Sequence, residues 1–156
     1  LHSFPTRRSS DLPEFNKLGF LIRSAMNRFA ATSIKQFSIA SARPGGEIAT
    51  LSGGNMQKVV LARELAGSPK FVIANQPTRG LDVGSIEFVH RSLIAARDEG
   101  AAVLLVSVEL DEIMSLSDRV IVLYRGEIAG EVDPQTVTQE EIGLLMGGSR
   151  LVAGKP

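Results

Sequence analysis

The sequence predicts an α/β fold with a mainly parallel sheet, and two observations support this. Two short apolar runs, residues 71–74 and 102–107, have the length and composition of strands buried on both faces. Helical patterns separate and flank these runs, and buried strands that alternate with helices are typical of α/β proteins with a parallel sheet. Because ligands of such folds bind at the carboxyl ends of the strands, we expect functional residues directly after each run.

The composition excludes several kinds of protein. The chain has 156 residues, the size of one ordinary domain, with 17 basic and 17 acidic side chains and a formal net charge of zero. This balance argues against a nucleic-acid partner bound through bulk positive charge. Because there is no cysteine, disulfides, thiolate metal sites and cysteine nucleophiles are excluded. The longest purely apolar run, residues 101–106, is far shorter than the roughly 20 residues of a membrane-spanning helix.

Residues 1–13 have neither helical nor strand periodicity. They resemble a translated sequencing adapter, a contaminant found at the ends of assembled reads, and we expect a leader that is non-native or disordered. The alternative is a natural disordered linker. In either case these residues are assigned no function.

Two helices are predicted in the first half of the chain. Residues 20–37 carry apolar side chains at steps of three and four, which is the spacing of one helix face. A Pro-Gly-Gly loop follows at residues 44–46. The second helix, residues 55–66, has the same periodicity and ends before a Gly-Ser-Pro sequence at residues 67–69.

Three more helices and a hairpin complete the predicted order. Residues 83–98 have helical periodicity, and Gly100 follows as a stop signal. The last helix begins at Thr138, because Glu141 stands three residues later as in a capping box. The remaining predicted elements are a short helix at residues 109–116 and the two strands of a hairpin, residues 120–124 and 127–132.

The sharpest candidate site is residues 51–58. Gly53 and Gly54 stand directly before a helix, so backbone N–H groups without helical partners lie at the positive end of the helix dipole. Glycine lets an anion approach the backbone closely, and the Ser52 hydroxyl adds a donor. These features suit a phosphate group. The alternative is a flexible turn with a serine cap.

The same segment strongly resembles the signature motif of ABC-type ATPases, in the Asn-x-Gln-Lys form typical of sugar and nucleoside importers. Residues 77–84 resemble the D-loop segment of those importers. Residues 104–107 and 109–112 resemble the strand and helix around the family's switch region. The resemblance extends over roughly residues 19–147, and the pattern at residues 74–82 favours the nucleoside branch.

The resemblance implies a partial P-loop NTPase domain of the ABC-type ATPases, with a mainly parallel sheet and part of the helical subdomain. Residues 14–66 would hold that part of the helical subdomain with the signature motif. Residues 67–148 would form the C-terminal part of the ATPase core, before a flexible tail at residues 149–156. The sequence holds no Gly-x-x-x-x-Gly-Lys-Ser/Thr phosphate loop, so we expect a C-terminal fragment whose phosphate loop lies upstream.

Three positions depart from the family's pattern. At the end of the first strand the family has an aspartate that helps to hold Mg²⁺ and a glutamate that polarises the attacking water. This chain has Asn75 and Gln76 there, and a neutral amide is a weak ligand for Mg²⁺ and cannot accept a proton from water. Val108 stands where the switch histidine is expected. We therefore expect the chain's own hydrolytic site to be degenerate.

The signature motif is intact, and in the family it contacts ATP that is held by the phosphate loop of the other domain in a dimer. The resemblance therefore implies that this chain binds that ATP in trans and that its D-loop reaches across the dimer. The residues expected to bind ATP are Leu51, Ser52, Gly53, Gly54, Asn55 and Gln57, and those of the D-loop are Gly80, Leu81 and Asp82. ATP and Mg²⁺ are expected only in the complete dimer.

The implied function is energy coupling in an ABC importer for nucleosides or simple sugars. The implied partners are a second nucleotide-binding domain upstream in the same polypeptide, transmembrane permease subunits and, indirectly, a substrate-binding lipoprotein. The expected location is peripheral, on the cytoplasmic face of the bacterial plasma membrane. The alternative is a non-catalytic domain that completes the dimer and docks on the permease. A soluble ABC ATPase that acts on DNA or ribosomes is disfavoured by the zero net charge.

Overall fold

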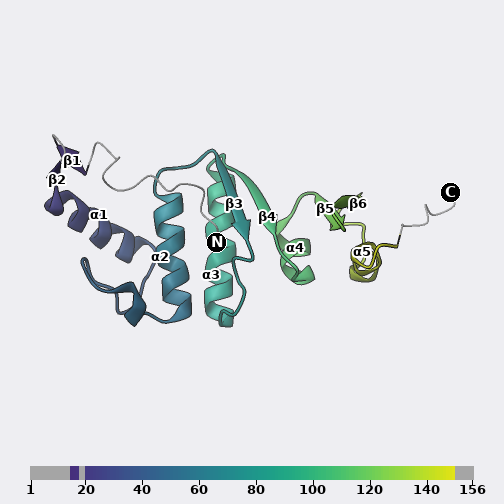
Figure 1. The fold of residues 1–156 in the computed structure, drawn as a ribbon, viewed down its shortest axis with the longest axis horizontal. Helices are drawn as coiled ribbons and strands as arrows, with labels where there is room; N and C mark the ends of the chain where they lie inside the picture. The colour runs from purple at the N-terminus through teal and green to yellow at the C-terminus, as the bar shows by residue number, and fades with distance from the viewer. Residues whose placement is uncertain (1–14, 18–19, 150–156) are drawn as a thin grey trace. The chain divides into compact units, whose positions relative to one another are not determined.

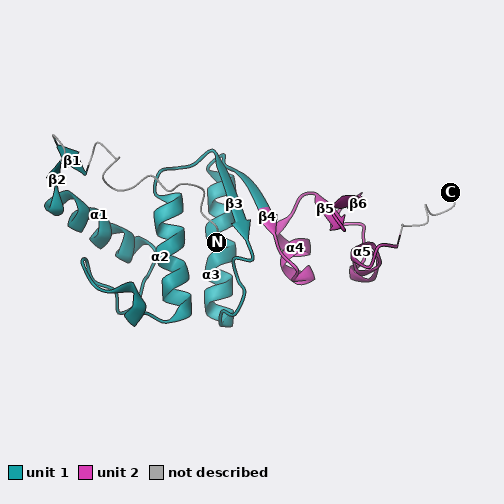
Figure 2. Cartoon of the chain, in the orientation of Figure 1, with its two compact units in different colours: residues 1–104 teal, residues 105–156 magenta. Residues whose placement is uncertain are grey.

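The computed structural model describes residues 15–17 and 20–149. The expected leader and residues 150–156 of the expected tail lie outside them. The chain divides into two compact units, Leu1–Leu104 and Leu105–Pro156, with the boundary inside a strand (Figure 2).

The first unit begins with a small antiparallel strand pair, β1 (Asn16–Lys17) and β2 (Phe20–Leu21). The helix α1 (Arg23–Gln36) follows, so the predicted start at Phe20 is wrong by three residues. The physical reason is that Phe20 pairs with Lys17 in the strand register, although the apolar helical spacing continues through it.

The helix α2 (Gly53–Leu65) begins two residues earlier than predicted, because Ser52 caps it. A single 3₁₀ turn, Ile48–Thr50, precedes it. Leu61 and Ala62 of α2 are buried, and α2 packs against α1 on one side and α3 (Val83–Asp98) on the other (Figure 1). The N-terminus of α2, which carries the candidate anion site, is thereby held on a packed helix.

The strands β3 (Phe71–Asn75) and β4 (Ala102–Val106) form a two-stranded parallel sheet, joined by α3. The bounds of α3 agree with the prediction, and its apolar stripe buries Val89, Leu93 and Ala96. Along β3 the side chains alternate between exposed Phe71 and Ile73 and less exposed Val72 and Ala74. Within the described residues β3 pairs only with β4, so one of its flanks is unpaired.

The second unit consists of α4 (Leu110–Leu116), the hairpin of β5 (Val120–Tyr124) and β6 (Glu127–Val132), and α5 (Gln139–Met146). The hairpin is confirmed with the predicted bounds, and its turn has positive φ angles of 49° at Arg125 and 84° at Gly126. Positive φ at both central residues is the requirement of a type I′ hairpin turn. A register shift between Val122 and Leu123 interrupts the strand pairing.

One side of this hairpin packs against α5. The side chains that form the small core of the second unit are Val120, Val122, Ile142 and Leu145. Thr138 caps α5, and the predicted capping box with Glu141 is confirmed in both directions. The helix is thereby fixed at its start.

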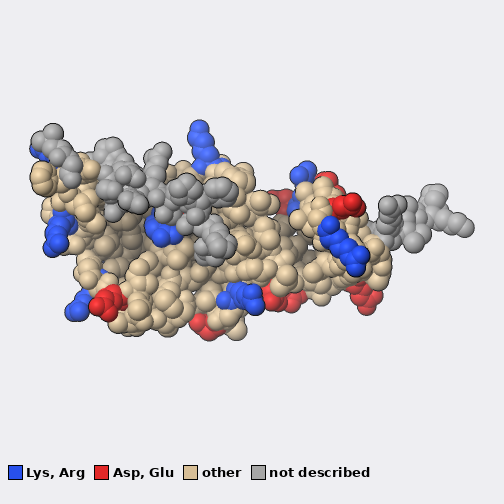
Figure 3. All heavy atoms as spheres, viewed as in Figure 1, with Lys and Arg blue, Asp and Glu red and all other residues tan. Residues whose placement is uncertain are grey.

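No helix in residues 15–17 and 20–149 is both long and apolar enough to cross a bilayer. On the face drawn in Figure 3, the basic and acidic side chains of each unit are interspersed rather than gathered by sign. Local hydrogen-bond donors therefore matter more than a charged field for any anion site on this face.

Candidate functional site

The hydroxyl of Ser52 is oriented by the residue that follows the two glycines. Its Oγ accepts hydrogen bonds from the backbone N–H of Asn55 at 3.4 Å and from Asn55 Nδ2 at 3.0 Å. A hydroxyl oxygen has two acceptor positions and one proton to donate. Both acceptor positions are used, so the Ser52 proton is the part of the group left to bind a ligand.

Asn55 is itself fixed from a second direction. Its Oδ1 accepts the backbone N–H of Ala40 at 3.0 Å, which attaches the segment before the motif to the first turn of α2. Leu51, which precedes Ser52 and has an extended conformation, donates its N–H to the carbonyl of Ile48 at 3.0 Å. The turn is thus held on both sides of Ser52.

The two glycines have different roles. A Cβ on Gly53 would meet no atom within 4 Å, so this position is open. A Cβ on Gly54 would lie 2.1 Å from Ser85 Oγ, which no side chain tolerates without a shift of its neighbour. Gly54 is therefore required for the close approach of α2 to the start of α3, while Gly53 leaves room for a ligand.

Three donors lie at the positive end of α2. The backbone N–H groups of Gly53 and Gly54 have no hydrogen-bond partner among the described residues, as expected for the first turn of a helix. The Ser52 hydroxyl is the third donor. Backbone N–H groups at a helix N-terminus, together with the helix dipole, favour an anion such as a phosphate.

Asp82 caps α3 and faces the same region. Its Oδ1 accepts the backbone N–H of Ser85 at 3.0 Å, and its Oδ2 accepts the Ser85 hydroxyl at 2.8 Å. The hydrogen bond from the Ser85 side chain, followed by that from its backbone, lowers the pKa of Asp82 below its ordinary value. The carboxylate is ionised at neutral pH, and its two oxygens are oriented by Ser85.

The rest of the D-loop segment lies between β3 and Asp82. Gly80 is exposed with a φ of 74°, and Leu81 donates its N–H to the carbonyl of Thr78 at 3.1 Å. Gln57 reaches this segment from α2, because its Nε2 donates to the carbonyl of Pro77 at 2.9 Å. Gln57 therefore contacts protein in this structure, whereas the sequence predicts contact with ATP.

Asn75 is the last residue of β3 and is exposed. Gln76 follows in the left-handed region with a φ of 49°, a conformation that costs a non-glycine residue energy and is found at functional sites. Both side chains end in neutral amides. The described part of the chain has no group of three or more His, Cys, Asp or Glu residues that could hold a metal ion. These residues do not fit Mg²⁺.

Val108 belongs to the second unit. It lies between β4 and α4, and 60% of its surface is exposed. The preceding Ser107 accepts the backbone N–H of Glu109 at 3.0 Å, which forms a tight turn before α4. An isopropyl group at this exposed position cannot form a hydrogen bond with a phosphate.

Two contacts of the candidate site were not predicted from the sequence. The Asp-x-x-Ser spacing of residues 82–85 is a helix-capping pattern, and it could have predicted the bonds between Asp82 and Ser85. The approach of Ser85 to Gly54 has no sequence signal. It depends on how α2 and α3 pack, and the two residues are far apart along the chain.

The chain has close relatives among curated proteins, although no protein-family profile matches it. It is 47% identical over 139 residues to the nucleoside import ATP-binding protein NupA of Lactococcus lactis, which is 89% of this chain and 28% of the relative. It is 48% identical over 135 residues to the guanosine import ATP-binding protein NupO of Bacillus subtilis, 86% of this chain and 26% of the relative. The chain spans about a quarter of the length of these relatives.

A third relative is named for a sugar. The ribose import ATP-binding protein RbsA 2 of Rubrobacter xylanophilus is 40% identical over 141 residues, which is 90% of this chain and 27% of the relative. These identities extend over both compact units rather than over one motif, as the covered shares show.

Solved structures share the fold. A dimeric bacterial ABC transporter cassette matches 69% of this chain and 46% of its own, with a TM-score of 0.59 and 28% identity. A putative metal-chelate type ABC transporter in an inward-facing conformation matches 85% of this chain and 52% of its own, with a TM-score of 0.69 and 17% identity. Each match covers about half of the solved chain.

Proposed function

The chain belongs to the ABC-type ATP-binding proteins, and from that premise we propose that it donates its signature turn, residues 51–55, to ATP held by a partner domain. It would do so as part of the energy-coupling subunit of an importer for nucleosides or simple sugars. The three donors at the start of α2 carry this proposal, because none of them donates a hydrogen bond to another group among the described residues.

The partner's phosphate loop would bind most of the triphosphate, and the turn of this chain would bind its exposed end. Ser52 would donate its hydroxyl proton, and the backbone N–H groups of Gly53 and Gly54 would donate beside it. Donors that are already oriented cost no reorganisation when charge develops on a phosphate, which is why such groups accelerate phosphoryl transfer. Asn55 and Gln57 would support the turn, and Asp82 and Gly80 would face the partner domain.

We also propose that the hydrolytic site on this chain's own strands is degenerate. Asn75 and Gln76 lack the negative charge that a Mg²⁺ ion and an attacking water need, and Val108 lacks a donor for the phosphate. No step is assigned to Mg²⁺ on these residues. Hydrolysis would occur at the ATP held by the partner domain, in the site that the signature turn of this chain completes.

The relatives support the substrate class and the assembly. Two of them are named as importers of nucleosides or guanosine and one as an importer of ribose. Their greater length favours a longer polypeptide, with a second nucleotide-binding domain upstream. The permease subunits, an indirect contribution of a substrate-binding lipoprotein and a location on the cytoplasmic face of the plasma membrane belong to the same proposal.

The substitution Ser52→Arg in the whole ATP-binding protein tests the proposal. It replaces the donor with a long side chain in the space that the phosphate would occupy, and loss of one such donor typically costs about a hundredfold in turnover. We expect ATP hydrolysis to fall by at least that factor. Gln135→Arg adds the same charge at an exposed loop residue and serves as the control. Unchanged hydrolysis in Ser52→Arg contradicts the proposal.

The second candidate is a non-catalytic domain that completes the dimer and docks on the permease, which Asn75, Gln76 and Val108 favour. The two candidates differ in what the turn does with nucleotide. Measurement of nucleotide occupancy and turnover at each site of the whole protein separates them. Loss of turnover at the partner's site in Ser52→Arg supports the donated turn, whereas turnover at this chain's own strands contradicts the degenerate site.

A further inference from the structure

We propose that Ser85 is a positioning residue that fixes the signature turn of α2 relative to residues 77–82, the segment that follows β3. The inference rests on the proposed function, because it concerns how the same turn is held in place. It adds a residue outside the signature motif and the D-loop, and it predicts that the turn and this segment move together.

The first contact is steric. Ser85 is buried, with 9% of its surface exposed, and its Oγ occupies the place where a Cβ of Gly54 would be. The distance from that Cβ position to Ser85 Oγ is 2.1 Å, and the distance to Ser85 Cβ is 3.0 Å. The second residue of α2 therefore rests directly on the first turn of α3.

The second contact keeps the Ser85 hydroxyl from rotating away. Its proton is donated to Asp82 Oδ2 at 2.8 Å, and the Ser85 N–H is donated to Asp82 Oδ1 at 3.0 Å. The hydroxyl bond sets the direction of the Ser85 side chain, and the backbone bond holds the carboxylate that accepts it. The oxygen that touches Gly54 is thus fixed by the cap of α3.

The third contact is one turn further along α2. Gln57 Nε2 donates to the carbonyl of Pro77 at 2.9 Å in a half-buried position. Together with the contact between Gly54 and Ser85, this attaches α2 to residues 77–85 at two points. Two points of attachment restrict rotation as well as separation, so we expect a shift of this segment to be transmitted to the Ser52 hydroxyl and its neighbours.

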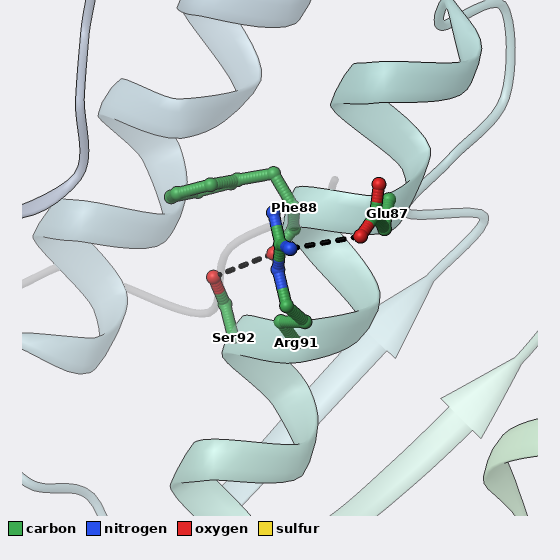
Figure 4. Close-up of polar contacts among 4 residues, drawn as sticks. All are labelled: Glu87, Phe88, Arg91 and Ser92. Atoms are coloured by element: carbon green, nitrogen blue, oxygen red, sulfur yellow. Dashed lines mark hydrogen bonds and ion pairs between the residues drawn. The ribbon is translucent and has the colours of Figure 1, made fainter.

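The chain offers a matched control in Ser92, which lies two turns later on α3. Its hydroxyl donates to the carbonyl of Phe88 at 2.8 Å, inside the same helix (Figure 4). The neighbouring pair in that figure, Arg91 and Glu87, is exposed. Ser92→Ala therefore removes a half-buried hydroxyl of α3 without touching either point of attachment to α2.

The test compares Ser85→Ala with Ser92→Ala in the whole ATP-binding protein by hydrogen–deuterium exchange and by ATP hydrolysis. For Ser85→Ala we expect faster exchange of the backbone amides in residues 51–57 and about tenfold lower kcat, since small misplacements of catalytic groups have effects of this order or larger. For Ser92→Ala we expect neither change. Faster exchange throughout α3 and β3 in Ser85→Ala would indicate general loosening and overturns the proposal.

A second pair of variants tests the contact itself. Gly54→Ala drives its Cβ into Ser85 Oγ, although alanine is otherwise the better helix former. In a Ser85→Gly background that clash is absent. We expect Gly54→Ala to lower the melting temperature and kcat in the presence of Ser85 and to have a smaller effect on both with Gly at position 85. Equal effects in the two backgrounds overturn the proposal.

The two proposals fail in different ways. If Ser52→Arg leaves hydrolysis unchanged, the signature turn is not used and the proposed function is wrong, but the exchange measurement still decides whether Ser85 holds the turn. If Ser52→Arg abolishes hydrolysis and Ser85→Ala behaves like Ser92→Ala, the proposed function stands and the role of Ser85 is overturned.

Discussion

The lowered pKa of the Asp82 carboxyl has one neighbour as its main cause. The Ser85 hydroxyl is the largest cause of its lowered pKa, and the Ser85 backbone N–H is the next. A carboxylate whose pKa is lowered by folding stabilises the folded state. This stabilisation is fully present at pH values above the pKa of the unfolded state, near 3.8. That contribution is lost as pH falls through the lower, folded pKa.

Ser85→Ala should therefore raise the pKa of Asp82 toward 3.8 and move the acid-induced loss of the α3 cap to higher pH. The reason is that the largest stabilising hydrogen bond to the ionised form is removed, while the backbone bond remains. Titration of the Asp82 carboxyl carbon by NMR measures the shift. Ser92→Ala is the control, and an unchanged Asp82 titration in Ser85→Ala would contradict the assignment.

At single positions, the sequence predicts which residues form a site more reliably than it predicts what those residues contact. Ser52 and Gly54 are predicted from an anion-binding pattern directly before a helix, whereas the structure places Ser52 as the cap of α2 and Gly54 inside its first turn. The partner of Gln57 was not predictable, because the carbonyl of Pro77 carries no side-chain signal. The same holds for the packing of Gly54 on Ser85, which is decided by the distance between two helices.

At the scale of elements, local signals determined most boundaries. The ends of α3 and of both hairpin strands agree with the predicted residues, because a helix stop, a two-residue turn and a clear apolar period coincide there. The start of α1 was wrong, since pairing of Phe20 with Lys17 competes with the helical pattern. A short strand pair of this kind cannot be recognised from helical periodicity alone.

The capping box of α5 gives a prediction about that helix alone. Thr138 accepts the N–H of Glu141, and Glu141 accepts the N–H of Thr138 at 2.8 Å. Thr138→Ala should lower the free energy of unfolding of the second unit by about 1 kcal/mol, the usual cost of losing such a cap. Chemical denaturation followed by circular dichroism measures it. Thr138→Ser keeps the hydroxyl, and an equal loss in that variant would exclude capping as the cause.

At the scale of the whole molecule, the sheets expose apolar side chains on one face. In the first unit these are Phe71 and Ile73 of β3, and in the second they include Leu123 and Ile128, which are directly opposite each other in the hairpin. Exposed apolar strand faces and unpaired edges favour association with another surface. We expect the isolated chain to be poorly stable, and a cooperative melt at high temperature would contradict this.

Replacing the opposed pair on the hairpin tests whether this face is an exposed apolar surface. Leu123 is 68% exposed and Ile128 is 66% exposed, so Leu123→Thr with Ile128→Thr should reduce binding of the dye ANS while changing the free energy of unfolding by less than about 1 kcal/mol. Val122→Thr changes a buried side chain of the same strand and should cost about 1–3 kcal/mol. ANS fluorescence that is unchanged by the double substitution would show that this face is not the exposed apolar surface.

The α/β class and the order of the elements from α1 onward followed from the sequence, because each of these elements satisfies its own periodicity, whereas the strand pair β1 and β2 was not predicted. The division into two compact units did not follow from it. It depends on how many contacts cross the boundary at Leu104 and Leu105, and that boundary falls inside a strand predicted as one continuous apolar run. A packing boundary need not coincide with any change in composition.

The side-chain amide of Asn55 determines whether the Ser52 hydroxyl presents its proton or its lone pairs to a ligand. The N–H of Ala40 can only donate, so the amide oxygen must face Ala40 and the NH₂ group must face Ser52. An aspartate at this position would present a second oxygen in place of that NH₂. The Ser52 hydroxyl would then donate its proton to the new oxygen. Its lone pairs would face outward and would repel an anion. Replacing the amide NH₂ group at position 55 by an oxygen, with no movement of the backbone, would therefore change Ser52 from a donor to phosphate into a residue that only caps the helix.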